Sequence, residues 1–310
     1  METEQAPRDV LRIAVTGSSG LVGRRLTPYL ESRGHRVVRV VREKVTGTFC
    51  LKGPLDASHK RCLSPFPGLE GVDAVVHLAG ENIFGRWTAS KKERILQSRR
   101  QGTELISRTI ARLDHRPHVL VSASAVGYYG DSGERPVDES DGPGKGFLAE
   151  VCQAWEEATR PAAEADIRTV RLRIGLVLSA DGGALKMMLT PFRLGLGGRI
   201  GSGGQYMSWI HVDDLVRAIE QAILDDALTG PVNAVAPNPV TNRQFTKTLG
   251  GLLRRPTVFA VPSFAAKLAF GEMAEETLLS GQRVEPKKLQ ERGFQFEYPE
   301  LEDALRREIG

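Results

Sequence analysis

Gly17, Gly20 and Gly23 lie near the start of the chain with the G-x-x-G-x-x-G spacing of a phosphate-binding loop. The first two glycines allow a tight turn that brings the backbone close to a pyrophosphate, and the third lets a helix pack on the preceding strand. The amino terminus of that helix offers unpaired N–H groups and a positive partial charge. The pattern therefore predicts a dinucleotide-binding loop, with a plain tight turn as the alternative. The expected contacts are Gly17, Ser18, Ser19, Gly20, Leu21 and Val22.

The end of the next strand indicates which dinucleotide would bind. That strand finishes Val40, Val41, Arg42, and Glu43 follows. An acidic residue at this place suits the ribose 2′-hydroxyl of NAD, whereas an arginine suits a 2′-phosphate. We therefore expect NADP rather than NAD, with Val41 and Arg42 among its contacts. The alternative is a solvated arginine that merely ends the strand.

The elements that must position these residues follow a β-α-β pattern. Val22, Leu26 and Leu30 recur every four residues, as on one face of a helix, and Gly34 ends that helix before the second strand. Strands alternating with helices predict a doubly wound α/β fold with a parallel Rossmann sheet. The expected strands are 11–16, 35–42, 72–79, 119–124 and 168–174, and the expected helices are 21–30, 90–113 and 147–165.

Changes in composition along the chain suggest its domain organisation. Residues 1–9 are polar and are expected to form a flexible tail. Residues 10–230 form the expected NADP-binding Rossmann domain, and within it the glycine-rich segment 175–210 is expected to form loops that line the substrate site. Residues 231–310 contain shorter elements and more prolines, so we expect a smaller C-terminal α/β lobe that closes over the sheet edge.

Length, charge and cysteine content argue against several classes of protein. The 310 residues have ordinary globular composition and a net charge of +4, with basic and acidic residues interspersed, so we expect no nucleic-acid partner. No apolar run approaches the ~20 residues of a membrane helix, and the start lacks a signal-peptide core. We therefore expect no membrane partner. Three cysteines without a C-x-x-C pair suit a reducing compartment, so we expect a cytoplasmic protein without a metal site.

Several longer stretches of the sequence resemble those of a known protein family. Residues 77–82 (HLAGEN) and 122–130 (SASAVGYYG) resemble the extended and atypical short-chain dehydrogenase/reductase superfamily, specifically its branch of nucleoside-diphosphate-sugar-epimerase or cell-division-inhibitor-like proteins. Residues 191–198, 208–215 and 232–237 extend the likeness. The resemblance implies a Rossmann core followed by a small C-terminal domain without an assigned role.

The resemblance also implies positions along the cofactor. It places Arg99 on the helix beside the cofactor and Val177 near the nicotinamide, and it places Leu78, Ala79 and Gly80 along the ribose and nicotinamide side. The residues themselves agree, because Leu78–Gly80 and Ser122, Ala123 and Ser124 follow or end strands of the predicted sheet. Ligands bind at that edge in open α/β folds.

Active members of the superfamily use a serine and a Tyr-x-x-x-Lys pair, and here the pair is missing. Ser124 occupies the serine position, but Leu148 and Cys152 stand where the tyrosine and the lysine would be. We therefore assign Ser124 and Tyr128 as the catalytic residues, Tyr128 as proton donor. The alternative for Tyr128 is a pocket wall. The expected substrate contacts are Glu81, Asn82 and Arg193.

Together these features predict an NADP(H)-binding oxidoreductase or epimerase-like protein. Its substrate would be a small or nucleotide-linked carbonyl or alcohol, and we expect a monomer or a homodimer. Two alternatives remain open. One is a catalytically silent dinucleotide-binding protein that serves as a sensor or interaction partner, which the absent Tyr-x-x-x-Lys pair favours. The other is a sugar-nucleotide epimerase with an unusual acid/base set.

Overall fold

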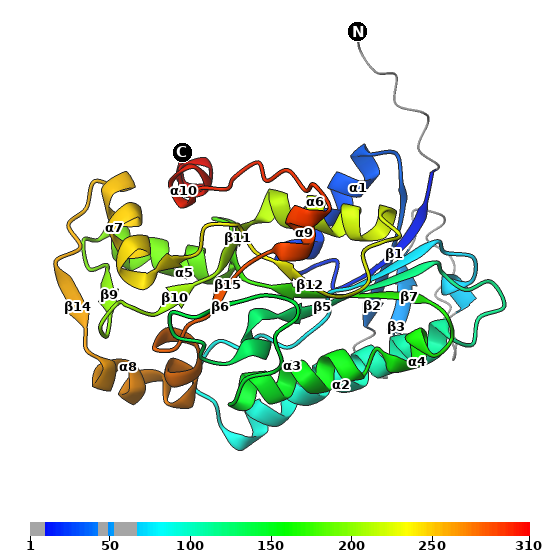
Figure 1. The fold of residues 1–310 in the computed structure, drawn as a ribbon, viewed down its shortest axis with the longest axis horizontal. Coiled ribbons are helices and arrows are strands. Elements are labelled where there is room, and N and C mark those ends of the chain that lie inside the picture. The colour runs from blue at the N-terminus through cyan, green and yellow to red at the C-terminus, as the bar shows by residue number, and fades with distance from the viewer. Residues whose placement is uncertain (1–9, 43–48, 53–66) are drawn as a thin grey trace, which may run out of the picture.

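The computed structural model describes residues 10–42, 49–52 and 67–310, and a central sheet organises this part of the chain (Figure 1). Within it, six strands run parallel and β3 pairs antiparallel at one edge. The doubly wound parallel fold is therefore confirmed. In spatial order the strands are β12 (Gly230–Ala234), β7 (Arg168–Ile174), β5 (Val119–Ala125), β4 (Ala74–His77), β1 (Arg12–Thr16), β2 (Arg36–Arg42) and β3 (Phe49–Lys52).

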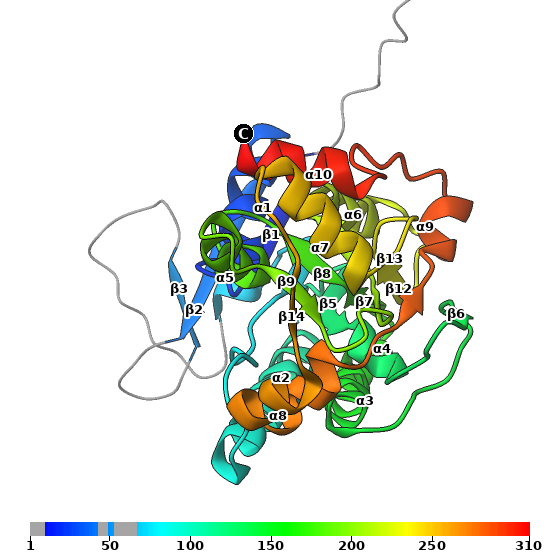
Figure 2. The same cartoon turned by 90° about the vertical axis from the view of Figure 1, so that its left-hand side faces the viewer.

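Helices cover both faces of the sheet (Figures 1 and 2). On one face α1 (Leu21–Ser32) packs against α6 (Val212–Leu224), and Leu26, Leu215 and Ile219 are fully buried between these helices and the strands. On the other face lie α2 (Ala89–Ile110), α3 (Phe147–Glu157) and α4 (Arg160–Ala163). Strand order reverses between β1 and β4, and this switch point is where open α/β sheets bind ligands.

Several of the remaining elements build a second hydrophobic core beside the sheet edge. Its buried members include Leu185, Phe192, Trp209, Phe245 and Leu305. Its helices are α5 (Gly183–Arg193), α7 (Asn242–Leu252) and α10 (Leu301–Ile309), whereas α8 (Ser263–Phe270) and a π-helical turn at Ala274–Leu278 pack Phe270 and Leu278 into a separate cluster with Trp87 and Ile95. Short strand pairs join them: β10 (Tyr206–Met207) with β13 (Val240–Thr241), β11 (Trp209–His211) with β8 (Leu176–Leu178), β14 (Phe259–Val261) with β9 (Gly198–Ile200), and β15 (Arg283–Val284) with β6 (Pro136–Val137).

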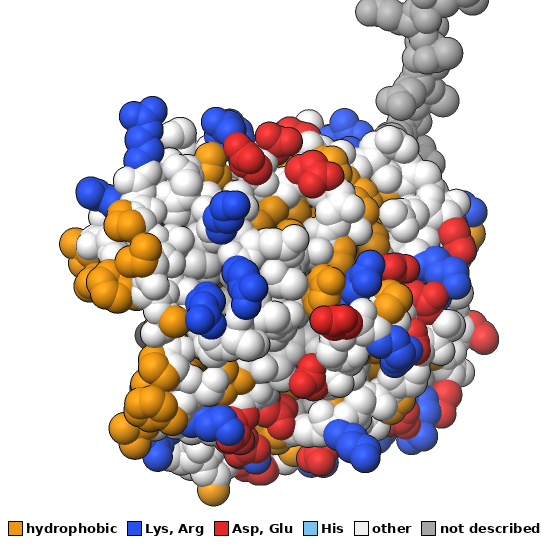
Figure 3. Space-filling model, turned by 60° about the vertical axis from the view of Figure 1, so that its left-hand side comes forward, with side chains coloured by type: hydrophobic (Ala, Val, Ile, Leu, Met, Phe, Trp, Pro, Cys, Tyr) orange, Lys and Arg blue, Asp and Glu red, His pale blue; other side chains and the backbone are white. Residues whose placement is uncertain are grey.

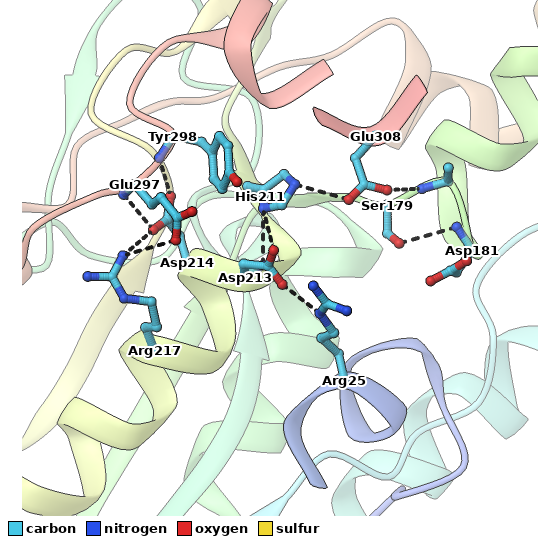
Figure 4. A network of polar contacts seen from close by, with 11 residues as sticks. Arg25, Ser179, Asp181, His211, Asp213, Asp214, Arg217, Glu297, Tyr298 and Glu308 are labelled. Atoms are coloured by element: carbon cyan, nitrogen blue, oxygen red, sulfur yellow. Dashed lines mark hydrogen bonds and ion pairs between the residues drawn. The ribbon is translucent and has the colours of Figure 1, made fainter. Parts of the chain in front are cut away.

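A buried polar network ties the C-terminal helix to the Rossmann core (Figure 4). One carboxylate oxygen of Glu308 of α10 lies 3.0 Å from Nε2 of fully buried His211, and its other oxygen accepts the Ala180 N–H. His211 Nδ1 accepts the Asp213 N–H at 3.1 Å, and the Asp213 carboxylate pairs with Arg25 of α1 at 2.6 Å. The chain end is thereby joined to the first helix through one histidine.

Two expectations need correction. The helix expected over 147–165 is divided: α3 ends at Glu157 and α4 begins at Arg160, with Pro161 in the first turn of α4, where its missing N–H costs nothing. The segment 175–210 is not only loop, because it contains α5 and packs into the second core. Within residues 231–310, α9 (Lys287–Glu291) packs Leu289 against the main sheet, and the expected domain boundaries stay a prediction.

Candidate cofactor and active site

The glycine loop crosses the end of β4 at a distance that only glycine allows. Gly17 has φ +67°, and a Cβ there would lie 2.8 Å from the Leu78 carbonyl carbon and 2.9 Å from the Ala79 nitrogen. A Cβ on Gly23 would lie 2.3 Å from the Gly17 oxygen. Both contacts fall well inside van der Waals distance, so any side chain would force the loop apart. The spacing of the glycines therefore sets how closely α1 and β4 approach β1.

The amino terminus of α1 opens beside this crossing. Gly20 is its N-cap residue, no side-chain cap occupies it, and the first turn carries no acidic residue. The first N–H groups of a helix have no partner within the helix, and they carry a positive partial charge. A pyrophosphate supplies the negative charge and the hydrogen-bond acceptors that these unpaired N–H groups can bind. The residues present thus fit a dinucleotide.

Thr16, the last residue of β1, stabilises the place where the glycine loop crosses the end of β4. Its hydroxyl is 2.8 Å from His77 Nδ1 and accepts the Leu78 N–H at 3.2 Å. Both Thr16 and His77 are fully buried. Burial lowers the pKa of His77 to about 4, so the ring is neutral at physiological pH and acts as a hydrogen-bonding spacer.

A cleft of about 410 Å³ lies over the loop and brings most of the predicted cofactor contacts together. Val40 and Ser98 also line it; neither was predicted. Ser98 precedes Arg99 on α2 and its hydroxyl accepts the Glu81 N–H at 3.0 Å. Leu21 and Val22 lie in the adjoining first turn of α1. The predicted residues in the lining are Gly17, Ser18, Ser19, Gly20, Val41, Leu78, Ala79, Gly80 and Glu81.

Besides Leu21, Val22 and Arg99, four further predicted cofactor contacts do not line the cleft or have side chains outside the described part of the chain. Ser122 and Ala123 are buried in β5, and Val177 is half-buried in β8. The backbone of Arg42 ends β2, but its side chain lies outside the described part of the chain, as does Glu43. The roles assigned to all four therefore stay predictions.

Arg99 lies directly behind Gly80. A Cβ on Gly80 would be 3.4 Å from the Arg99 guanidinium carbon. That guanidinium stacks 4.8 Å from the Trp155 ring of α3 and donates to the Glu81 carbonyl at 3.0 Å. Burial lowers the pKa of Arg99, but an arginine keeps its charge in proteins. A positive charge is therefore held against the wall of the cleft by α3.

The three residues predicted to bind substrate are not gathered into one place. Glu81 pairs with Lys91 of α2 at 2.8 Å, and this bond lowers the pKa of its carboxyl. Asn82 is exposed and accepts the Phe84 N–H at 2.9 Å. Arg193 is exposed at the end of α5 and does not line the cleft. Their roles also stay predictions.

Ser124 points toward α3. Its hydroxyl donates to Glu156 Oε1 at 2.8 Å, and the side chain is only 2% exposed. Glu156 in turn receives two hydrogen bonds from Arg173 of β7, at 2.8 and 3.0 Å. The strand register explains why Ser124 and Arg173 bind the same carboxylate, because the two residues lie opposite each other in the β5–β7 pair. The sequence did not show that the serine proton already has an acceptor.

Arg173 also fixes the two tyrosines that follow β5. Its guanidinium lies 3.5 Å from the centre of the Tyr128 ring and donates to the Tyr129 hydroxyl at 2.9 Å. Tyr129 is buried, donates to Asn233 at 2.7 Å, and has its pKa raised to about 12 by burial. Tyr128 is half-buried, and its contacts within the described residues are aromatic. Neither Tyr128 nor Ser124 lines the cleft over the glycine loop, and their catalytic roles stay predictions.

Helix α3 offers no proton relay at the two replaced positions. Leu148 packs against Gly127, where an added Cβ would approach Leu148 Cβ to 3.2 Å. Cys152 is buried, which raises the pKa of its thiol to about 12. The amino terminus of α3 is capped from 128 residues away: the Glu276 carboxylate accepts the Phe147 and Leu148 N–H groups at 2.8 and 3.0 Å. The C-terminal region thus closes over this helix.

The fold and the glycine crossing define a dinucleotide-binding protein of the Rossmann class. Comparison with known proteins agrees. The model of the "NAD dependent epimerase/dehydratase family" matches residues 13–234, and a "domain of unknown function (DUF1731)" matches residues 261–308. An epimerase family protein of Mycobacterium tuberculosis is 45% identical over 94% of this chain and 96% of its own. Human epimerase family protein SDR39U1 is 37% identical, over 96% and 99%.

Solved structures give the same result. The human SDR39U1 structure with NADPH superposes with a TM-score of 0.85 at 36% identity, over 96% of this chain and 99% of that one. A nucleoside-diphosphate sugar epimerase of Corynebacterium glutamicum gives 0.77 at 37% identity, over 97% and 59%. The chain belongs to the NAD dependent epimerase/dehydratase family, as its motifs predicted.

Proposed function

We propose that the protein is an NADPH-dependent oxidoreductase of the epimerase type, acting on a small or nucleotide-linked carbonyl or alcohol. The observation that carries this proposal is the crossing of Gly17 over Leu78 and Ala79 beside the uncapped amino terminus of α1. A backbone with no room for a side chain, next to free N–H donors, is what a pyrophosphate requires.

The preference for NADP rests on Arg42. A guanidinium at the end of β2 can bind a 2′-phosphate through two hydrogen bonds, and Val41 just before it lines the cleft. The human relative, which was solved with NADPH, supports the same choice. NAD is the less favoured cofactor, because the residue that would bind its 2′-hydroxyl is displaced by one position to Glu43.

For the reduction of a carbonyl, NADPH when bound supplies the hydride. The protein must then protonate the substrate oxygen and hold it in place. Tyr128 is the proposed proton donor, because its hydroxyl is not used by another described residue and Arg173 holds its ring. The bond from Tyr128 oxygen to its proton breaks as the new O–H bond of the alcohol forms, and water restores the proton.

Ser124, the other predicted catalytic residue, is held by a hydrogen bond to Glu156. Its hydroxyl would have to leave Glu156 before it could donate to a substrate oxygen. In the present geometry it instead fixes the end of β5, from which Tyr128 follows. Arg193 and Asn82 are exposed, and Arg193 forms no ion pair among the described residues, so it is available to an anionic substrate group.

A second candidate, a silent dinucleotide-binding protein, is favoured by Leu148 and Cys152 at the relay positions. The test is NADPH oxidation with a panel of aldehydes and ketones, comparing wild type with Tyr128→Phe. The matched control is Tyr129→Phe, which removes a buried hydroxyl beside it. Turnover that Tyr128→Phe abolishes and Tyr129→Phe retains supports the enzyme. NADPH binding without any oxidation across the panel supports the silent protein.

A further inference from the structure

Two long segments of the C-terminal half contain cations but no anions. Residues 182–212 and 227–271 hold no Asp or Glu at all, although acidic residues make up 38 of the 310. In the fold these segments lie together, forming α5, α7, α8 and the β9–β14 pair. Their cations are Lys186, Arg193, Arg199, Arg243, Lys247, Arg254, Arg255 and Lys267.

Large apolar side chains project to solvent from the same elements (Figure 3). Val258 is 81% exposed, Phe264 74%, Leu268 75% and Phe259 56%. Phe264 and Leu268 lie one turn apart on α8, and each residue of β14 is exposed. Single exposed apolar residues are ordinary, but a group of this kind marks an interaction site. Leu194, Leu196, Met187 and Val261 are also exposed on these elements, and Phe84 lies beside α8.

We define the apolar–basic surface as these exposed apolar residues with the eight cations. Within the described residues Lys267 alone among those cations forms an ion pair, with Glu275 at 2.8 Å. Nearby Glu272 pairs with Lys92 at 2.7 Å, outside the surface. Its positive charge is therefore largely uncompensated by the protein itself.

We propose that the apolar–basic surface docks on an anionic lipid bilayer. A second copy of the chain would set cation against cation, which disfavours an isologous dimer through this face. A nucleic acid would neutralise the cations but leave the Phe and Leu side chains unburied. A bilayer with anionic headgroups satisfies both, since apolar side chains enter the acyl boundary while Lys and Arg meet the headgroups.

The arrangement on α8 fits this occupant. Phe264, Leu268 and Lys267 share a short helix, and its two large apolar side chains are left exposed by the described residues. No helix of the described residues has the length and hydropathy to cross a bilayer, and docking at the surface requires none. The expectation that the protein has no membrane partner considered only spanning segments.

The test is flotation of the full chain with phosphatidylcholine vesicles, with and without phosphatidylglycerol. We expect flotation only with phosphatidylglycerol, weakened by salt because the attraction is screened. Arg254→Gln with Arg255→Gln should lower the partition coefficient about fivefold for each cation removed. Phe264→Ser with Leu268→Ser should lower it by more than about tenfold. Leu105→Ser and Arg112→Gln, both exposed on or after α2, should have no effect.

Two outcomes overturn the proposal. The first is no flotation with phosphatidylglycerol, or flotation that the α8 variants leave unchanged. The second is a dimer, measured by light scattering, that Phe264→Ser with Leu268→Ser converts to monomer, since a second copy would then cover the face. All variants should keep NADPH affinity, which separates this test from the proposed function.

Discussion

Ser124 and Glu156 are joined by a buried hydrogen bond of 2.8 Å, and this bond connects β5 to an ion pair between α3 and β7. Glu156 and Arg173 are 6% and 3% exposed, so their charges stabilise each other with little help from water. Since the serine proton is held inside this network, the geometry assigns Ser124 first to positioning the end of β5.

Replacing Ser124 distinguishes positioning from substrate contact. Ser124→Ala removes a donor to a buried carboxylate, so we expect a loss of about 1 to 3 kcal/mol in unfolding free energy with NADPH affinity retained. Ser122→Ala is the matched control, because the Ser122 hydroxyl makes only a 3.3 Å contact with a neighbouring carbonyl. Urea unfolding measures both. Turnover lost without any loss of stability would instead restore the direct catalytic role.

Glu156 should be among the costliest residues to neutralise. Glu156→Leu leaves the Arg173 guanidinium buried without its carboxylate, and such losses cost about 3 to 5 kcal/mol. Glu157→Leu on the same helix removes only an exposed pair with Arg160, so it should cost less than about 1 kcal/mol. Equal midpoints of urea unfolding for the two variants would contradict the buried network.

The glycine loop should tolerate no branched side chain. Gly20→Val adds bulk where a Cβ already approaches the Gly17 oxygen to 3.2 Å, at the terminus where the pyrophosphate would lie. We expect it to abolish binding of NADPH and NADH alike, as measured by titration calorimetry. Gly142→Ala, where an added Cβ meets nothing within 4 Å, should bind both as wild type does. Retained affinity in Gly20→Val would place the cofactor elsewhere.

Arg42 should determine the preference of the protein for NADPH over NADH. Losing a charged pair of hydrogen bonds to a 2′-phosphate costs about 1.5 to 3 kcal/mol, so Arg42→Ala should weaken NADPH binding roughly tenfold or more and leave NADH unchanged. Arg39→Ala, on the same strand with its side chain half-exposed near Glu31, is the control. Equal losses for both nucleotides would refute the role of Arg42.

Local pattern was enough to predict five of the seven strands of the sheet and the glycine loop, but not β3 and β12 at the two edges. The segments Ile13–Val15 and Val119–Val121 are apolar runs, which are typical of buried parallel strands, whereas Arg168–Ile174 (RTVRLRI) was predicted from β-branched and apolar residues between its arginines. The constraints on Gly20 and Gly23 were predictable because the atoms that an added Cβ would meet belong to Gly17 and Ser18, whereas the crossing of Gly17 over Leu78 and Ala79 was not. The family resemblance, carried by stretches spread over most of the chain, was confirmed by comparison with known proteins.

What the sequence could not show depends on contacts between distant residues. The Glu276 cap on α3 spans 128 residues, and the stacking of Arg99 on Trp155 joins two helices. The acceptor for Ser124 is fixed by sheet register and helix packing together, neither of which a motif records. The helix α5 was missed because its flanking glycines resemble a loop, while Leu185, Leu189 and Phe192 supply the buried face.

His77 should make stability depend on pH. Its pKa falls from 6.5 to about 4 on folding, so between these values the unfolded chain binds one proton that the folded chain does not. Stability from this residue is complete above pH 6.5 and is lost by about 1.4 kcal/mol per pH unit as pH falls toward 4. His77→Gln removes the titrating group, so its urea-unfolding free energy should fall less steeply across that range. His118→Gln, at an exposed position, should follow wild type. Parallel curves for wild type and His77→Gln would show that the ring is not held neutral behind the cofactor loop.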